Sequence, residues 1–175
     1  MTRIALVIFD TRLGNTFQVA EAITRGLRQT PGVEATCANQ AEVHAEQLEA
    51  ADLLVIGGPT EYFRASKHIR EFFARIGGFA LRGKLGFAFD THSATPLSGH
   101  ASRLIERDLR HLGVTLLEPR HSALTREVRT DGRSTAHIVL DPAAVAEFEK
   151  IGRHLGEEML AAIAAHPRTD TEGAD

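Results

Sequence analysis

The sequence predicts a doubly wound α/β fold, in which a five-stranded parallel sheet of strand order 2-1-3-4-5 carries helices on both faces. Two observations support this fold class. Apolar runs such as residues 4–9 and 53–56 contain no alternating polar residues, which is typical of strands covered on both faces. Each run is followed by a segment whose apolar residues recur at helical spacing. With no internal repeat or linker, one domain is expected over residues 1–165.

The first half of the chain predicts two strands and two helices. A strand over residues 4–9 is followed by a polar turn, and the next helix repeats apolar residues every four positions from residue 19 to residue 27. Thr30-Pro31-Gly32 predicts a turn. A short strand is then expected over 33–38 and a helix over 41–51.

The second half predicts the same alternation, with a glycine after several of the helices. The expected elements are, in order, strand 53–56, helix 66–76, strand 84–89, helix 98–111, strand 114–117 and helix 143–165. The segment 118–141 is the hardest to assign. Within it, residues 133–140 could form an extra or split strand after an Asp131-Gly132 turn.

Composition excludes several classes of protein. Net charge is −3, which argues against a nucleic-acid partner held by phosphate neutralisation. No apolar stretch has the roughly 20 residues of a membrane helix, and no signal peptide precedes the first strand, so a cytoplasmic location is expected. Cys37 is the single cysteine, so no disulfide framework or multi-cysteine metal site is expected. Residues 166–175 are polar and expected to form a disordered tail.

The polar turn at residues 10–16 has the features of an anion site. It joins a buried strand to a helix N-terminus, where free backbone N–H groups and the helix dipole favour phosphate. Thr11 and Thr16 add hydroxyl donors. The turn lacks both the Walker pattern and the dinucleotide Gly-x-Gly-x-x-Gly pattern, which leaves a monophosphate site. In the alternative without a ligand, Asn15 or Thr16 only caps the helix.

Two further polar segments follow strong strands, at residues 57–64 and 90–96. The carboxyl ends of parallel strands meet at one edge of a sheet, and ligands of doubly wound folds bind beyond that edge. We therefore expect the segments 10–16, 57–64 and 90–96 to form one site.

These three segments together resemble those of the flavodoxin family. Residues 11–16, Thr-Arg-Leu-Gly-Asn-Thr, are similar to the family's phosphate loop, Ser/Thr-x-Thr-Gly-x-Thr. Leu13 departs from the pattern at the third hydroxyl position, and either Arg12 or Asn15 could compensate. The resemblance implies an FMN site formed by Thr11, Arg12, Leu13, Gly14, Asn15, Thr16, Pro59, Thr60, Glu61, Tyr62, Phe63, Asp90, Thr91 and His92.

The resemblance also implies how the flavin ring is covered. In the family, the second loop covers one ring face, so Tyr62 or Phe63 is expected to stack there. The third loop lies near the pyrimidine edge of the ring. His92 either takes the opposite face or leaves it open, and Asp90 and Glu61 are expected to disfavour full reduction. No catalytic residue is assigned, and no histidine is expected to ligate a metal.

The resemblance implies an FMN-binding one-electron carrier that acts with redox partner proteins, a reductase and an electron acceptor. Two alternatives stay open. One is an FMN-dependent NAD(P)H:quinone-type reductase, although such enzymes commonly carry a longer insertion than the segment 118–141. The other is a flavodoxin-fold binding module without flavin, which the departure at Leu13 and the scarcity of aromatic residues would fit.

Overall fold

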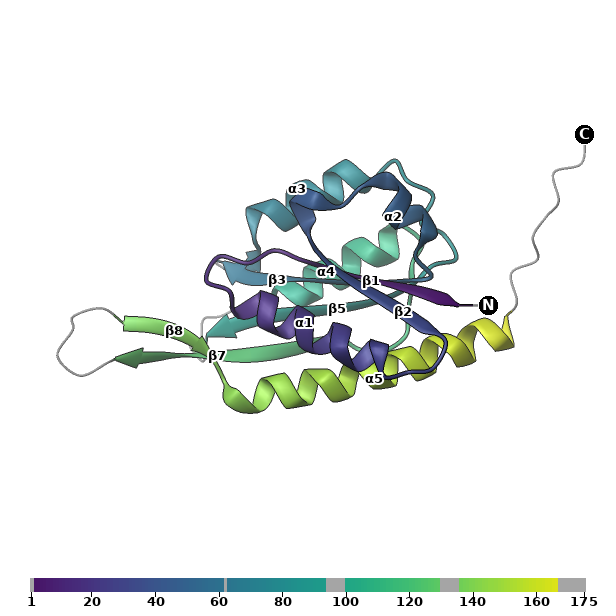
Figure 1. Cartoon of the computed structure of the whole chain (residues 1–175). Coiled ribbons are helices and arrows are strands. Elements are labelled where there is room, and N and C mark those ends of the chain that lie inside the picture. The colour runs from purple at the N-terminus through teal and green to yellow at the C-terminus, as the bar shows by residue number, and fades with distance from the viewer. Residues whose placement is uncertain (1, 62, 94–99, 130–135, 167–175) are drawn as a thin grey trace, which may run out of the picture.

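The computed structural model describes residues 2–61, 63–93, 100–129 and 136–166. The structure contains one sheet, and helices cover both of its faces, as the sequence predicted (Figure 1). The sheet is mixed, because it contains parallel and antiparallel pairs. The strands are β1 (Arg3–Phe9), β2 (Val33–Asn39), β3 (Leu53–Glu61), β4 (Arg64–Ala65), β5 (Leu85–Ser93), β6 (Thr115–Leu116), β7 (His121–Arg129) and β8 (Ala136–Leu140). The helices are α1 (Asn15–Arg28), η1 (Gln40–Glu42), α2 (Ala45–Ala50), α3 (Lys67–Ile76), α4 (Ala101–His111) and α5 (Pro142–Ala165). The predicted disordered tail lies almost wholly outside the described residues.

The sheet has the order β2-β1-β3-β5-β7-β8, with β6 paired to β5 and β4 paired to β3. The prediction of five parallel strands needs two corrections. The fifth strand is split, because β6 pairs with residues 85–86 of β5 whereas β7 pairs with residues 89–93. In addition, β8 runs antiparallel to β7. Six residues separate the end of β7 from the start of β8, whereas a parallel strand would need a crossover of a dozen or more residues.

Alternate residues of each strand face two separate cores. Val7, Phe87 and Phe89 pack on the face that α1 and α5 cover. Ile8 and Ala88 pack on the opposite face, against α3 and α4. Because successive side chains of a strand point to opposite faces, this alternation predicts which way the polar residues at the end of β5 point.

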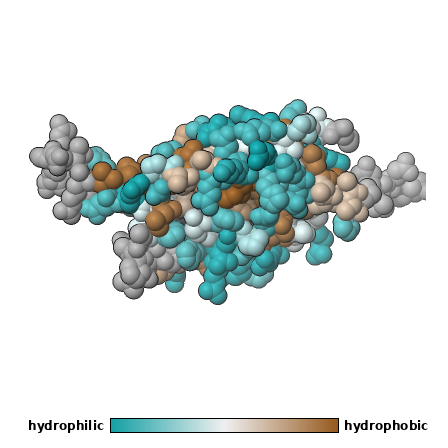
Figure 2. Space-filling model, turned by 90° about the horizontal axis from the view of Figure 1, so that it is seen from below, coloured by the Kyte–Doolittle hydropathy of each residue, from teal (hydrophilic) through white to brown (hydrophobic). Residues whose placement is uncertain are grey.

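Helices α1 and α5 pack closely together on one face of the sheet (Figure 1). Glycines permit this approach, since a Cβ atom on Gly152 would lie 2.1 Å from the carbonyl oxygen of Ile23. Figure 2 shows the outer side of this layer as mostly hydrophilic, with small separate hydrophobic areas. Within the part of the chain that the structure describes, no helix is both long and apolar enough to cross a membrane.

Two strands extend further than the sequence predicted. β3 continues to Glu61 because its end pairs with β4, and β5 continues to Ser93 because its end pairs with β7. Much of the expected polar loops is therefore strand. The helix expected over 41–51 is also shorter, since the chain forms η1 and then begins α2 with His44 as the N-cap.

Candidate functional site

A cleft of about 200 Å³ lies at the carboxyl ends of β1, β3 and β5. All three polar segments of the sequence contribute to it, and the β7–β8 hairpin closes one side. The lining residues are Thr11, Arg12, Leu13, Asn15, Thr16, Pro59, Thr60, Glu61, Thr91, His92, Ser93, Thr125 and Ile138.

The N-terminus of α1 forms the floor of one end of the cleft. Gly14 is the N-cap residue, with a left-handed φ of 82°, and no side chain caps this helix end. The alternative in which Asn15 or Thr16 caps α1 is therefore wrong. The Gly14 N–H donates to Thr11 Oγ1 at 3.0 Å. Because the first-turn N–H groups of a helix have no partner within the helix, they are available to an anion.

Thr16 and Thr91 join this helix to the sheet. Thr16 is 1% exposed, and its Oγ1 lies 2.8 Å from Thr91 Oγ1. Thr91 points toward α1 because it continues the alternation of Phe87 and Phe89 along β5. In a bond between two hydroxyls only one hydrogen is used, so the pair keeps one hydroxyl hydrogen for another acceptor.

The β7–β8 hairpin is attached to the cleft by two hydrogen bonds. Asn15 Nδ2 donates to the Ile138 carbonyl at 3.0 Å, and Thr125 Oγ1 donates to the His92 carbonyl at 3.1 Å. The sequence did not identify Thr125 or Ile138 as cleft residues, and it included Ser93 only as part of the segment 90–96. The pairing of β7 with the end of β5 brings Thr125 to this edge, and the hairpin then brings Ile138 beside it. No local motif marks the pairing of β5 with β7.

The second segment contributes Pro59, Thr60 and Glu61 to the cleft. Phe63 does not line it. This residue has a left-handed φ of 66°, and its side chain is 55% exposed. It lies instead in a separate groove along α4, together with His100 and Arg103. Tyr62, the other aromatic residue predicted to stack, lies outside the described residues.

Asp90 lies beneath the cleft rather than in its lining, and it is fully buried. Its Oδ2 atom accepts three hydrogen bonds, from Thr60 Oγ1 at 3.3 Å, from the Ser102 N–H at 2.9 Å and from Ser102 Oγ at 3.0 Å. Among the residues that the structure describes, its buried Oδ1 atom has no hydrogen-bond partner. Through Oδ2, the carboxylate therefore connects β5 to the start of α4 and to Thr60 of β3.

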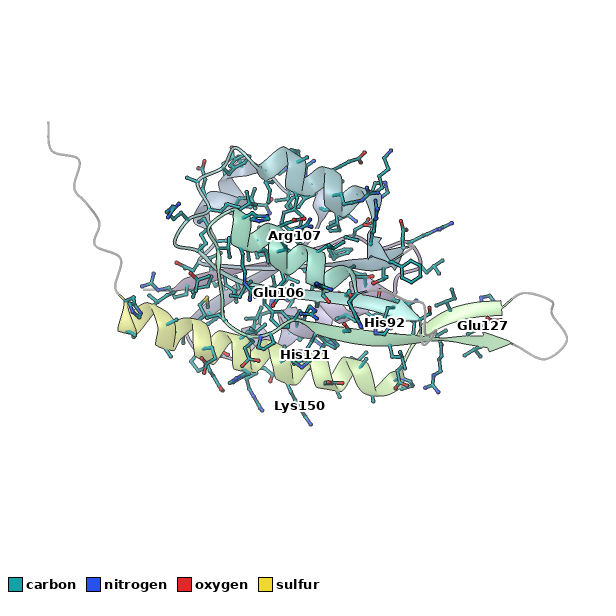
Figure 3. All side chains as sticks on the ribbon, turned by 180° about the vertical axis from the view of Figure 1, so that it is seen from behind. His92, Glu106, Arg107, His121, Glu127 and Lys150 are labelled. Atoms are coloured by element: carbon teal, nitrogen blue, oxygen red, sulfur yellow. The ribbon has the colours of Figure 1, made fainter. Side chains whose placement is uncertain are left out.

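His92 lines the cleft near the end of β5, beside the β7–β8 hairpin (Figure 3). Its ring lies 4.9 Å from the ring of His100, measured between centroids, in an edge-to-face arrangement. His100 is the N-cap residue of α4. Together with Asp90, the two histidines form a cluster whose possible ligand atoms lie within 4.8 Å of one another. The sequence spacing gave no signal of this cluster.

Fixed charge in the cleft lining is sparse. Among the described lining residues, Arg12 and Glu61 carry a formal charge. Hydroxyl groups, backbone amides and one cation thus surround the helix N-terminus. This arrangement can bind an anionic group at the start of α1 and a less polar group beside Pro59.

Comparison with known proteins identifies relatives of this chain. Residues 6–84 match the family model described as a flavodoxin domain. The type A flavoprotein fprA of Rhodobacter capsulatus is 30% identical over 155 residues, which are 82% of this chain and 35% of that protein. The NAD(P)H dehydrogenase (quinone) of Aromatoleum aromaticum is 30% identical over 141 residues, 63% of this chain and 68% of that protein.

A solved structure with the same fold is a flavodoxin from the domain Archaea, with a TM-score of 0.74 at 23% sequence identity. The match covers 90% of this chain and 99% of that chain. The chain is much shorter than the type A flavoprotein, because the aligned residues make up only 35% of that protein. The comparison thus supports the predicted fold class over nearly the whole chain.

Proposed function

Because this chain belongs to the flavodoxin family, we propose that it binds FMN in the cleft and carries electrons between redox partner proteins. The single observation that carries the proposal is the uncapped N-terminus of α1, which opens into a cleft that all three polar segments line. When bound, FMN supplies one- and two-electron redox chemistry, while the protein supplies binding, orientation and electrostatics.

The residues at the start of α1 fit a phosphate group. A phosphate monoester needs several donors at close range, and the first-turn N–H groups provide them together with the positive end of the helix dipole. Thr11 and Thr16 contribute hydroxyls, and Arg12 contributes a positive charge at the rim. Leu13 is 59% exposed and offers no hydrogen bond in place of the family's hydroxyl.

The side of the cleft formed by the ends of β3 and β5 fits a flat ring system. Pro59 and Thr60 offer an uncharged wall there, and His92 offers an aromatic one. Glu61 places a carboxylate beside this wall, where it would disfavour added negative charge. A small cleft of about 200 Å³ leaves part of a flavin ring outside it, which suits electron exchange with a partner protein.

An absorbance spectrum tests the proposal. Purified protein, supplemented with FMN and then desalted, is expected to keep one FMN per chain and to show a flavin band near 450 nm, an approximate property of flavins. A colourless protein after FMN supplementation would exclude the carrier and favour the flavin-free binding module. A cytoplasmic location and the exchange of electrons with a reductase and an acceptor protein remain predictions.

The similarity to an NAD(P)H dehydrogenase (quinone) favours a second candidate function, an FMN-dependent NAD(P)H:quinone-type reductase. The two functions differ in whether the protein accepts electrons directly from a nicotinamide. Anaerobic titration of the FMN-loaded protein with NADH and with NADPH separates them. A carrier stays oxidised until a reductase is added, whereas a reductase is bleached by the nicotinamide alone and passes the electrons to a quinone.

A further inference from the structure

We propose that Asp90, His92 and His100 form a binding site for a divalent transition-metal ion of the Zn²⁺ class, at the border between the cleft and the N-terminus of α4. The possible ligand atoms of these three residues lie within 4.8 Å of one another. Two imidazoles and one carboxylate form a donor set that zinc and similar ions accept. All three ligands come from the protein, and none from FMN. A result that excludes metal binding would therefore not exclude FMN binding.

The alternation of β5 explains why two of the ligands meet. Asp90 and His92 are two residues apart on one strand, so their side chains leave the same face of the sheet. That face is the one on which Ala88 packs toward α4. His100, as the N-cap of α4, enters the site from the helix that covers this face. The fold thus brings together residues from two different elements.

The uncompensated oxygen of Asp90 points to a missing positive partner. Oδ2 already accepts three hydrogen bonds, whereas Oδ1 is buried without one. Burying an unsatisfied carboxylate oxygen costs free energy, and such groups in proteins are normally paired or bound to a metal. A cation bound by the Asp90 carboxylate and the two imidazoles would reduce that cost.

In each of the two histidines, the Nδ1 atom lies within hydrogen-bonding distance of an oxygen atom, as is common in histidines that bind a metal through Nε2. His92 Nδ1 lies 3.0 Å from the Ser93 carbonyl oxygen, and His100 Nδ1 lies 3.3 Å from Ser122 Oγ. Hydrogen bonds of this kind fix the tautomer and the orientation of a ligating ring. They make Nε2 the ligating atom of each histidine.

The geometry requires only a small adjustment. Zinc ligands lie about 2.0–2.2 Å from the metal, so tetrahedral ligand atoms are about 3.4 Å apart. The observed spacing of up to 4.8 Å therefore has to shorten by at most about 1.4 Å when the metal binds. Three protein ligands leave a fourth position open to water or to a small anionic ligand at the cleft.

Zinc titration tests the site. The full chain is dialysed against a chelator and titrated with Zn²⁺ in competition with a chromophoric chelator of known affinity. We expect one Zn²⁺ per chain with micromolar or tighter affinity, and a loss of at least about tenfold in affinity in both His92→Ala and His100→Ala. Asp90→Asn, which keeps the side-chain size, should also weaken binding if it folds.

Two control variants make the outcome decisive. His111→Ala changes a histidine at the opposite end of α4 and should bind Zn²⁺ as the unmodified chain does. His154→Ala removes a surface histidine that contacts Glu118 and Glu157, and it should also leave the affinity unchanged. Millimolar affinity, unchanged affinity in His100→Ala, or a loss only in His154→Ala would overturn the proposal.

Discussion

Replacing Thr16 by valine should weaken FMN binding without a matching loss of fold stability. Valine keeps the branched shape of threonine but removes the hydroxyl that lies 2.8 Å from Thr91 Oγ1, at a position that is 1% exposed. A hydrogen bond to a charged group contributes about 1.5–3 kcal/mol. Since 1.4 kcal/mol corresponds to a factor of ten, the dissociation constant should rise by about 10- to 150-fold.

Thr91 determines where in this range the effect falls. Its hydroxyl remains in Thr16→Val and, having lost its partner, is free to donate to a ligand in the cleft. The double variant Thr16→Val/Thr91→Val removes both hydroxyls and should lie nearer the upper end. Affinity is measured by quenching of flavin fluorescence as the cofactor-free protein is added to FMN.

Thr24→Val provides the matched control for this experiment. Thr24 is also a buried threonine of α1, and its hydroxyl donates to the Ala20 carbonyl at 2.7 Å, away from the cleft. Both variants lose one buried hydrogen bond and should lose about 1 kcal/mol of unfolding free energy, but only Thr16→Val should lose FMN affinity. Equal affinities in the two variants would refute the role given to the start of α1.

Four further outcomes follow from the structure. Leu13→Thr restores a hydroxyl to the phosphate loop and should tighten FMN binding by up to about tenfold, measured by the same titration. Glu61→Gln removes a carboxylate from the cleft and should raise the potential of the second reduction step by about 20–40 mV, from a charge interaction of about 0.5–1 kcal/mol; an unchanged potential in redox titration would exclude this residue. Gly152→Ala places a Cβ atom 2.1 Å from the carbonyl oxygen of Ile23, so urea denaturation should show a loss of about 1–3 kcal/mol from overpacking. Burial raises the pKa of the Cys37 thiol from 9.0 to about 11, so a disulfide reagent at pH 8 should modify it far more slowly in the folded than in the unfolded chain.

Two of these predictions have internal checks. Gly78→Ala is the control for the overpacking variant, because nothing lies within 4 Å of a Cβ atom there and the stability should change little. For Cys37, the raised pKa means that the folded state holds the thiol proton more tightly than the unfolded state. Its contribution to stability is therefore complete below pH 9 and is lost as the pH rises toward 11. A fast thiol reaction in the folded chain at pH 8 would contradict the burial of Cys37.

The order of elements was readable because it depends on local patterns. Continuous apolar runs identify strands that both layers of helices cover, and helical spacing of apolar residues identifies the helices. The turn at residues 10–16 was also predicted as an anion site, since the strand, the turn and the helix start are adjacent in the chain. The structure adds that Gly14 is the N-cap residue of α1 and that no side-chain hydrogen bond caps this end of the helix. The N–H groups of the first turn are therefore available to a ligand.

Long-range pairing decided what the sequence could not. The β7–β8 hairpin adds Thr125 and Ile138 to the cleft because β7 pairs with the end of β5, about 30 residues earlier in the chain, and no local pattern encodes that register. The cluster of Asp90, His92 and His100 likewise forms only when α4 packs over the end of β5. Local patterning determined the elements and marked the turn at residues 10–16 as a candidate anion site, because strand, turn and helix are adjacent in the chain. Tertiary packing determined which side chains line the rest of the cleft and that Asp90 is buried beneath it, because those contacts join distant parts of the chain.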